Sequence, residues 1–423
     1  MPDLPTPSPL AKHWTLDPSW VFLNHGSYGG TPRAVLEEQT RWRGLLESEP
    51  VAFFVERHEG VMDEVRAALA GFVHCDAADL ALIPNASTGV ATVAANLKLN
   101  PGDEILISAH EYPACQNSLR QAAARHGSLV TYATIPFPCP SPEAVIQAYI
   151  DQVTPRTRLA LVSHVTSPTG LVLPVERLVR ELAGRGIDTL VDGAHAPGMV
   201  PALNLRELGA AYYTANCHKW ICSPKGSAFL WVRPDRQAGF RPLVLSNNAE
   251  KPKPGRSQFL TEFDYQGTSD YTSAYSIPKA IDFLGREIGG ALGQPVVSGD
   301  LRVGWQAIMN HNHELCLKGR DLLCRRLGIS PPAPDAMIGS ICTMILPAHD
   351  PARQARLAAR PSKYHDALQD ALLANHRIQV PVWGLAGRPE RFVRISAQAY
   401  NAIGQYEYLA DALASELEAE RRA

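Results

Sequence analysis

The feature that most constrains the fold is an alternation of short apolar runs with amphipathic segments between about residues 55 and 235. Strands alternating with helices of this length predict βα units around a largely parallel sheet, with helices on both faces. Seven strands are predicted: Leu80–Ile83, Glu104–Ser108, Leu129–Ala133, Leu159–Ser163, Thr189–Val191, Ala211–Thr214 and Ala228–Val232. The helices predicted between them are Gly60–Val73, Pro113–Arg125, Pro142–Val153 and Pro174–Arg185.

The remainder of the 423-residue chain predicts a smaller second domain. A Pro/Lys/Gly-rich segment at Lys251–Ser257 is typical of an exposed loop, and Leu301–Leu327 predicts a long helix. Further elements are predicted at Ser273–Arg286, Ile338–Leu346, Lys363–Ala374, Arg391–Ser396 and Tyr406–Arg421. We therefore expect an α/β protein with a large domain over residues 21–290 and a small α+β domain formed by residues 1–20 and 291–423.

Charge and cysteine usage limit the partners and the compartment. The formal net charge is −2 and no basic or acidic tract stands out, so nucleic acid and charged membrane surfaces are not expected partners. The eight cysteines form no Cys-x-x-Cys pair and no zinc spacing, which indicates reduced thiols and no metal site. Because the sequence shows no signal peptide and no apolar run of bilayer length, we expect a soluble cytoplasmic protein.

The sharpest chemical feature is Lys219, in the run Ala215-Asn216-Cys217-His218-Lys219-Trp220 just past a predicted strand. In open α/β sheets, ligands bind beyond the carboxyl ends of the strands. A lysine enclosed there has a lowered pKa and exposes a nucleophilic amine, which Schiff-base chemistry requires. Taken alone, an ordinary surface lysine would be the commoner explanation, so the neighbouring motifs decide.

An acid and a histidine follow another strand, in Leu190-Val191-Asp192-Gly193-Ala194-His195. A carboxylate at the position of Asp192 can pair with a protonated pyridine nitrogen and make the ring an electron sink. For a lone acid, capping of the next helix is the commoner role. His195 could reach a ring hydroxyl or the Schiff base, or simply satisfy a loop carbonyl.

Three more polar loops follow predicted strands. Ile83-Pro84-Asn85-Ala86-Ser87-Thr88-Gly89 leads into a helix whose free N–H groups and hydroxyls could bind a phosphate, although the same residues cap any helix well. In His110-Glu111-Tyr112-Pro113 the tyrosine ring could stack on a flat cofactor or lie in the core. Ser163–Gly170 adds hydroxyls. Loops that converge on one edge of a sheet carry more weight together than any one of them alone.

Two features lie outside the predicted sheet. The run Leu23-Asn24-His25-Gly26-Ser27-Tyr28-Gly29 is polar and Gly-rich, which suits a loop that closes over a site. Arg394 lies inside an apolar strand, and a buried arginine needs an anionic partner. A substrate carboxylate is one such partner and an internal salt bridge is the other.

These residues resemble class V aminotransferase-like enzymes of the pyridoxal 5′-phosphate (PLP)-dependent transferase fold type I, and within them the isopenicillin N epimerase-like subgroup. The resemblance runs from about Val21 to the final helix. It is carried by Val191–Gly198, Cys217–Trp220, His110–Tyr112 and Ser163–Gly170.

The resemblance implies that PLP is the cofactor, with Lys219 holding it and moving the α-proton. Asp192 would pair with the pyridine nitrogen, and His195 would lie near the ring hydroxyl. Tyr112 would stack on the ring, and Ala86, Ser87 and His218 would contact the phosphate. The residues implied to bind the cofactor are Asn85, Ala86, Ser87, Tyr112, Thr166, Ser167, Asp192, His195, Asn216, His218, Lys219, Gly267 and Thr268.

The same resemblance implies a substrate side and a partner subunit. Arg394 would hold the carboxylate of an amino-acid substrate, and Asn24, His25 and Gly26 would line that side of the site. Gly267 and Thr268 resemble a segment that reaches the phosphate of a neighbouring subunit, which implies a homodimer.

Loss of an α-proton opens several reactions, among which the shape of the pocket selects. Persulfide-forming desulfuration is disfavoured, because no cysteine follows Cys342 to supply the mobile sulfur acceptor. C–S β-elimination of an S-conjugated cysteine in natural-product biosynthesis needs one base and ranks first. Epimerisation needs a second acid opposite Lys219, for which His25, His110 and Tyr112 are candidates. Decarboxylation-linked oxidative deamination and a degenerate PLP-binding sensor remain as alternatives.

Overall fold

The computed structural model describes residues 4–293, 300–384 and 388–422, and its centre is a seven-stranded sheet of order β2-β8-β7-β6-β5-β3-β4. Strand β8 is antiparallel to both of its neighbours and the other pairs are parallel, as the alternating sequence pattern predicts. The strands are β2 (Leu80–Ile83), β3 (Glu104–Ser108), β4 (Leu129–Ala133), β5 (Thr157–Ser163), β6 (Asp188–Asp192), β7 (Tyr212–Asn216) and β8 (Ala228–Val232).

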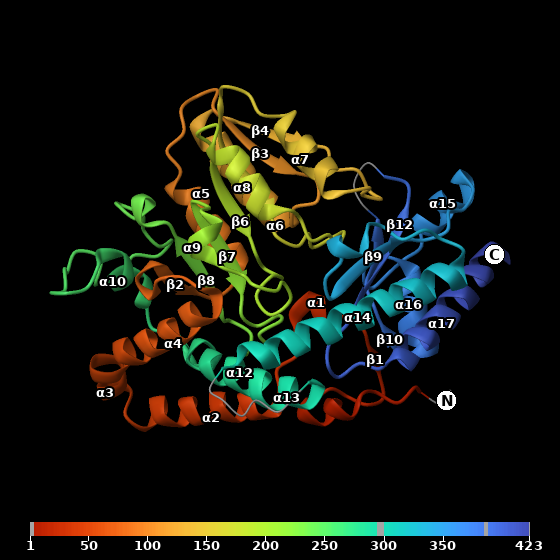
Figure 1. Ribbon diagram of the computed structural model, residues 1–423, viewed down its shortest axis with the longest axis horizontal. Helices are drawn as coiled ribbons and strands as arrows, with labels where there is room; N and C mark the ends of the chain where they lie inside the picture. The colour runs from red at the N-terminus through yellow and green to blue at the C-terminus, as the bar shows by residue number, and fades with distance from the viewer. Residues whose placement is uncertain (1–3, 294–299, 385–387, 423) are drawn as a thin grey trace.

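Helices cover both faces of this sheet because successive side chains along each strand enter different cores. In β6, Leu190 packs with α5 (Ala86–Asn96) and α6 (Pro113–His126), whereas Val191 packs with the other set of helices. That second set comprises α4 (His58–Val73), α7 (Pro142–Ile150) and α8 (Val175–Ala183). Figure 1 shows these helices arranged about the sheet.

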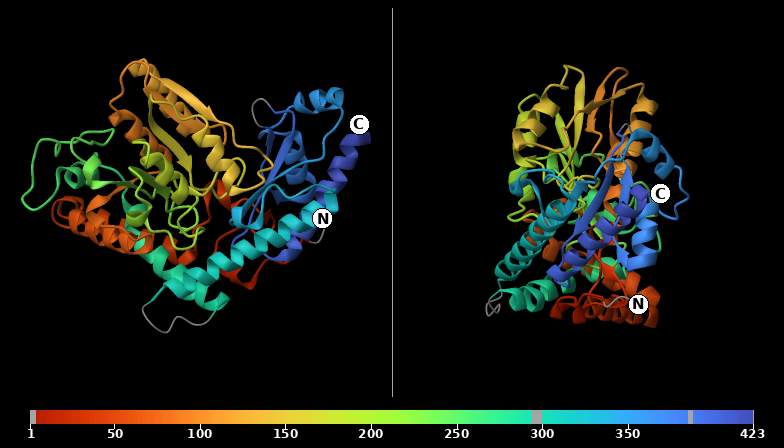
Figure 2. Two further views of the ribbon diagram at one scale, coloured as in Figure 1. Left: turned by 45° about the horizontal axis from the view of Figure 1, so that its top comes forward. Right: turned by 90° about the vertical axis from the view of Figure 1, so that its right-hand side faces the viewer.

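A smaller α+β part follows the sheet, as predicted. Its antiparallel sheet has the order β11-β12-β9, from β11 (Val382–Gly384), β12 (Arg391–Ser396) and β9 (Ile341–Ile345). Helix α14 (Arg302–Leu327) runs from the large sheet region to this part and packs on α17 (Ile403–Arg422) (Figures 1 and 2).

The N-terminal segment lies beside the C-terminal part. Strand β1 (Val21–Phe22) pairs in parallel with β10 (Ile378–Gln379), which places helix α1 (His25–Tyr28) between the two sheets (Figure 1). The other helices are α2 (Arg33–Ser48), α3 (Pro50–Ala52), α9 (Leu205–Leu208), α10 (Gln258–Asp264), α11 (Thr272–Tyr275), α12 (Ile277–Phe283), α13 (Gly289–Leu292), α15 (Pro351–Ala358) and α16 (Ala367–His376). Short 3₁₀ or π turns are η1 (Pro9–His13), η2 (Phe53–Arg57), η3 (Ala77–Asp79), η4 (Pro234–Arg236), η5 (Leu284–Ile288) and η6 (Asp335–Met337). Within the described ranges, none of the helices is long and apolar enough to cross a membrane.

Helix α5 is pressed against β7 at Gly89. A Cβ atom added there would lie 2.1 Å from Oγ1 of Thr214. Any residue other than glycine would therefore push the helix away from the strand. We expect Gly89→Ala to lower the free energy of unfolding by about 3 kcal/mol through overpacking. Chemical denaturation of the cofactor-free protein would measure this loss.

Gly71 provides the matched control because it also lies within a helix, α4, but is exposed and would leave an added Cβ with nothing within 4 Å. We expect Gly71→Ala to raise the free energy of unfolding by about 0.5–1 kcal/mol, because alanine loses less backbone entropy in a helix. Equal effects of the two substitutions would contradict the close-approach explanation.

Candidate active site

The site lies where the parallel strands β6 and β7 end. The turn after β7 is fixed by the backbone N–H groups of Cys217 and His218, which donate to the Ser227 carbonyl at 3.0 and 3.3 Å. Lys219 follows, and its Nζ atom lies 3.0 Å from Nε2 of His195. Burial, followed by the positive charge of Arg394, lowers the pKa of Lys219 to about 8. A substantial fraction of the amine is therefore neutral near that pH, as a general base requires.

Asp192 is the buried acid at the end of β6. Its Oδ1 atom accepts the Ala194 N–H at 2.9 Å, and its Oδ2 atom accepts the Cys115 thiol at 3.2 Å. Within the described residues it forms no ion pair, and burial raises its pKa. A buried carboxylate that has hydrogen bonds but no ion pair is stabilised by a cationic N–H donor as a further ligand.

The loop into α5 brings a helix N-terminus to the site. The Asn85 side chain caps the helix by accepting the Thr88 N–H at 2.9 Å, and Asn216 accepts the Ala86 N–H at 2.8 Å. Ser87 lies half-buried in the same first turn. Asn85 and Asn216 thus hold the backbone in place, while the helix N-terminus supplies a positive dipole end.

His218 presents one ring nitrogen to the same region. Its Nδ1 atom donates to the Ser227 carbonyl at 3.0 Å, which leaves Nε2 for another partner. Burial, followed by the charge of Lys219, lowers the pKa of His218 to about 4. The neutral ring can act as a hydrogen-bond partner but not as a fixed cation.

The loop after β5 contributes mainly through its backbone. The hydroxyl of Thr166 lies 2.8 Å from Oγ1 of Thr169 and accepts the Leu171 N–H at 2.8 Å, so it holds the turn itself. Ser167 contributes its carbonyl oxygen, which accepts a hydrogen bond from Nη1 of Arg394 at 2.5 Å.

Arg394 is buried without a carboxylate partner among the described residues. Its Nη2 atom donates to Oγ of Ser27 at 3.1 Å, while its Nε atom has no acceptor in the described structure. The guanidinium also lies 5.6 Å from the ring centroid of Trp383. Burial lowers the pKa of Arg394 to about 10. A buried, under-partnered guanidinium is a strong site for a carboxylate ligand.

The N-terminal helix α1 joins this end of the site. Asn24 accepts the Ser27 hydroxyl at 2.6 Å, and the Gly26 N–H donates to Oγ of Ser396 at 3.0 Å. His25 instead lies behind Lys219: Nε2 is 3.0 Å from the Lys219 carbonyl oxygen and Nδ1 is 2.9 Å from the Tyr400 hydroxyl. Both nitrogens of His25 are therefore engaged by the protein.

The remaining expected residues lie at the rim or apart from this cluster. Tyr112 precedes α6 with 46% of its surface exposed, so its ring is accessible for stacking. Thr268 is exposed and its hydroxyl lies 2.8 Å from that of Tyr265. Among the described residues, no hydrogen bond joins Gly267 or Thr268 to Lys219, Asp192 or His195.

Several contacts of the site were not foreseen from the sequence. Glu111 is fully buried behind the sheet edge and accepts hydrogen bonds from Ser108, Tyr149 and Ser163. Burial raises the pKa of Glu111 to about 7. Cys115, which donates to Asp192, lies on an apolar face of α6, and the sequence there does not indicate a contact with the site. No described cluster of three or more His, Cys, Asp or Glu side chains is arranged to hold a metal ion.

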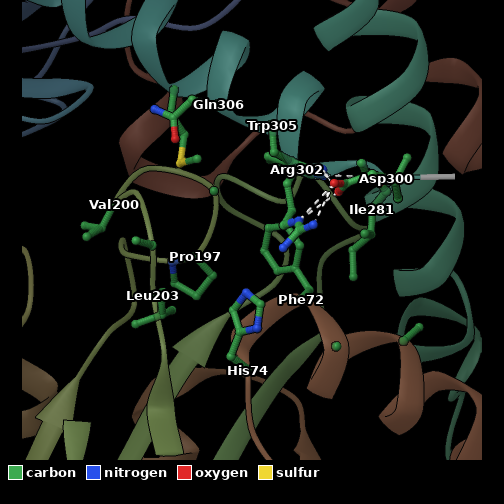
Figure 3. Close-up of a pocket in the computed structure, with 16 residues that line it drawn as sticks. Phe72, His74, Pro197, Val200, Leu203, Ile281, Asp300, Arg302, Trp305 and Gln306 are labelled. Carbon is green, nitrogen blue, oxygen red and sulfur yellow. Dashed lines mark hydrogen bonds and ion pairs between the residues drawn. The ribbon is translucent and has the colours of Figure 1, made fainter. Parts of the chain in front are cut away.

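A separate cavity of about 650 Å³ lies behind the loop that follows His195. Figure 3 shows Pro197, Val200 and Leu203 on one side and Trp305 on another, with Arg302 bonded to Asp300. Neither Lys219, Asp192 nor Arg394 lines it. The cavity is therefore separate from the cluster of these three side chains at the strand ends.

Comparison with known proteins agrees with this geometry. The family described as Aminotransferase class-V matches residues 32–292. Isopenicillin N epimerase of Streptomyces clavuligerus is 32% identical over 94% of this chain and 95% of its own length. Putative L-cysteine desulfhydrase 1 of Oryza sativa subsp. japonica is 29% identical over 92% of this chain and 82% of its own. A solved structure of C-DES with glycine covalently linked to its PLP-cofactor has a TM-score of 0.74 at 21% identity, covering 98% of this chain and 99% of that one.

Proposed function

The chain belongs to the class-V aminotransferase family of PLP-dependent enzymes, and from this premise we propose that it binds PLP and catalyses C–S β-elimination of an S-conjugated cysteine. The observation that carries the proposal is the buried guanidinium of Arg394, which has no carboxylate partner among the described residues and lies near the enclosed amine of Lys219. The pair provides an anchor for a substrate carboxylate and a base for the adjacent proton.

The residues present fit the cofactor. Asp192 can accept a hydrogen bond from a pyridinium N–H, and the N-terminus of α5 with Ser87 and His218 can take a phosphate. The exposed ring of Tyr112 can stack on the cofactor. When bound, PLP would supply an aldehyde for the substrate amine and a ring that accepts the electron pair left by the proton.

The protein's own residues would orient the substrate and move the proton. Ser167 and Ser27 hold the guanidinium of Arg394, which would bind the carboxylate and set the α-carbon toward Lys219. Nζ of Lys219 would take the α-proton, since burial keeps part of the amine neutral. His195 would hold Nζ in place and would lie near the cofactor's ring oxygen. The sulfur then leaves as a thiolate without a second base.

Epimerisation is the second candidate because isopenicillin N epimerase is among the relatives. It needs an acid on the face opposite Lys219. His25 has both nitrogens engaged, and His110 binds Oγ1 of Thr169 at 2.9 Å. Of the three candidates, Tyr112 has an exposed ring and would have to supply the proton. The L-cysteine desulfhydrase relatives and the single neutral base favour elimination.

We also propose a homodimer in which Gly267 and Thr268 approach the phosphate of the partner subunit. The support is that this segment is accessible at the surface. Several large apolar side chains are exposed as well, and burying them would favour association of two subunits. They are Tyr28, Val51, Val55, Leu243, Val244 and Leu245.

The test is to incubate the PLP-loaded protein with a panel of S-substituted L-cysteines in D₂O. We expect pyruvate release that requires PLP, measured enzymatically, with the fastest conjugate indicating the preferred substituent. Deuterium at the α-carbon together with D-enantiomer and no pyruvate would transfer the assignment to epimerisation. Neither pyruvate nor deuterium exchange with any conjugate would overturn the proposal.

A further inference from the structure

Trp220, the residue after Lys219, points back to His195. Its side chain is 1% exposed, and Nε1 lies 3.3 Å from Nδ1 of His195. An indole N–H can only donate a hydrogen bond, so Nδ1 must accept it and carries no proton. In a neutral imidazole the single proton then lies on Nε2.

The other nitrogen of the same ring faces the reactive amine. Nε2 of His195 is 3.0 Å from Nζ of Lys219. If Nε2 carries the proton, it donates to Nζ, and Nζ must offer a lone pair. A lysine ammonium would instead place two protons between the same two nitrogens, which is unfavourable in a buried site.

We propose that Trp220 is a positioning residue whose indole N–H fixes His195 as the Nε2–H tautomer, which donates to the uncharged amine of Lys219. The inference deepens the proposed function, because it rests on Lys219 being the reactive amine. Burial lowers the pKa of His195 well below its usual range, so the ring has one proton to place.

Packing holds the indole independently of this hydrogen bond. Trp220 packs with Val165, Met199 and Ile341, and its ring centroid is 4.7 Å from that of His25. A Cβ atom on Gly198 would come within 2.9 Å of the Trp220 carbonyl group, so the backbone is also confined. The indole N–H is thus presented to His195 by a rigid support.

The other charged groups around His195 and Lys219 are the same in the wild type and in a variant that lacks the Trp220 indole. Arg394, Asp192 and Cys115 act on Lys219, whereas Arg394, His25 and His218 act on His195 together with Lys219 itself. Because Trp220 carries no charge, its removal leaves these electrostatic contributions in place. A change in the protonation of Lys219 would then report the tautomer.

The experiment compares Trp220→Phe with Trp305→Phe in the cofactor-free protein. The rate at which an acylating reagent modifies Lys219 is followed against pH by peptide mass spectrometry. In Trp220→Phe the freed ring can place its proton on Nδ1 and accept a hydrogen bond from the Lys219 ammonium at Nε2, which stabilises the charged amine. We therefore expect the pH of half-maximal rate to move about one unit higher, about a tenfold change in affinity for the proton.

Trp305 is a matched control, because it is also buried and its indole N–H donates to the Ile281 carbonyl at 3.1 Å, away from His195. Its variant should leave the pH profile unchanged. An unchanged profile in Trp220→Phe would overturn the proposal.

A second measurement does not depend on any variant folding. Nitrogen NMR of the wild-type protein should show His195 protonated at Nε2, and a proton on Nδ1 would overturn the inference. Neither readout uses a substrate, so failure of the elimination assay would leave this result intact. Conversely, finding the other tautomer of His195 would contradict this inference without contradicting pyruvate release by the protein.

Discussion

Lys219→Ala is expected to lower kcat for elimination by at least about 10³-fold, because it removes both the covalent attachment point and the proton acceptor. No other lysine lies in the cluster around Asp192 and His195 within the described residues. Steady-state pyruvate release would measure the loss, and the absorbance of the bound cofactor would show whether the covalent link is gone.

Lys318→Ala is the control, since Lys318 lies on the exposed side of α14 in an ion pair with Glu314. We expect kcat to be unchanged in this variant. If Lys219→Ala retained wild-type turnover, Lys219 would not be the base and the assignment of the site would be wrong.

Arg394→Met is expected to lower kcat/KM by about 30- to 4,000-fold, mainly through KM. The estimate follows from the roughly 2–5 kcal/mol lost when one partner of a buried charge pair is removed. Because Arg394 has no carboxylate partner among the described residues of the free protein, the same change should not lower the free energy of unfolding. Kinetics and chemical denaturation on one preparation would test both expectations.

Arg391 lies on the same strand, β12, and we expect its substitution to affect stability and KM in the opposite way. Its guanidinium binds Glu420 at 2.5 Å and Asp366 at 3.2 Å, so it serves the fold. Arg391→Met should lower the free energy of unfolding by about 3–5 kcal/mol and leave KM near its original value. If Arg394→Met destabilised the protein while KM stayed constant, Arg394 would be structural.

The sheet could be predicted from the sequence because its strands are short apolar runs bounded by turns. The predicted strand Glu104–Ser108 is found with the same limits, and Thr189–Val191 is extended by one residue at each end. Helix α2 was not predicted. Its buried side chains are only Val35 and Gln39, so its sequence carries little apolar periodicity.

The grouping of the candidate site residues could be predicted only where a chemically reactive side chain follows the end of a predicted strand. Lys219, Asp192 and His195 were expected together and lie together. The hydrogen bond from Trp220 to His195 and the contact of His25 with the Lys219 carbonyl depend on side-chain directions. These directions are determined by tertiary packing, and a local sequence pattern does not predict them.

The pairing of β1 with β10 means that the proposed substrate end and the proposed cofactor end of the site come from different stretches of the chain. Most of the residues that we propose to hold the cofactor lie between 85 and 219, whereas Ser27 and Arg394, which meet at 3.1 Å, come from opposite ends of the chain. A change at Ser27 would therefore alter a partner of Arg394 while the hydrogen bonds of Asp192, which come from Cys115 and Ala194, stay in place. The surroundings of Arg394 can in this way be changed from the first residues of the chain, far in sequence from the strand ends that hold Asp192.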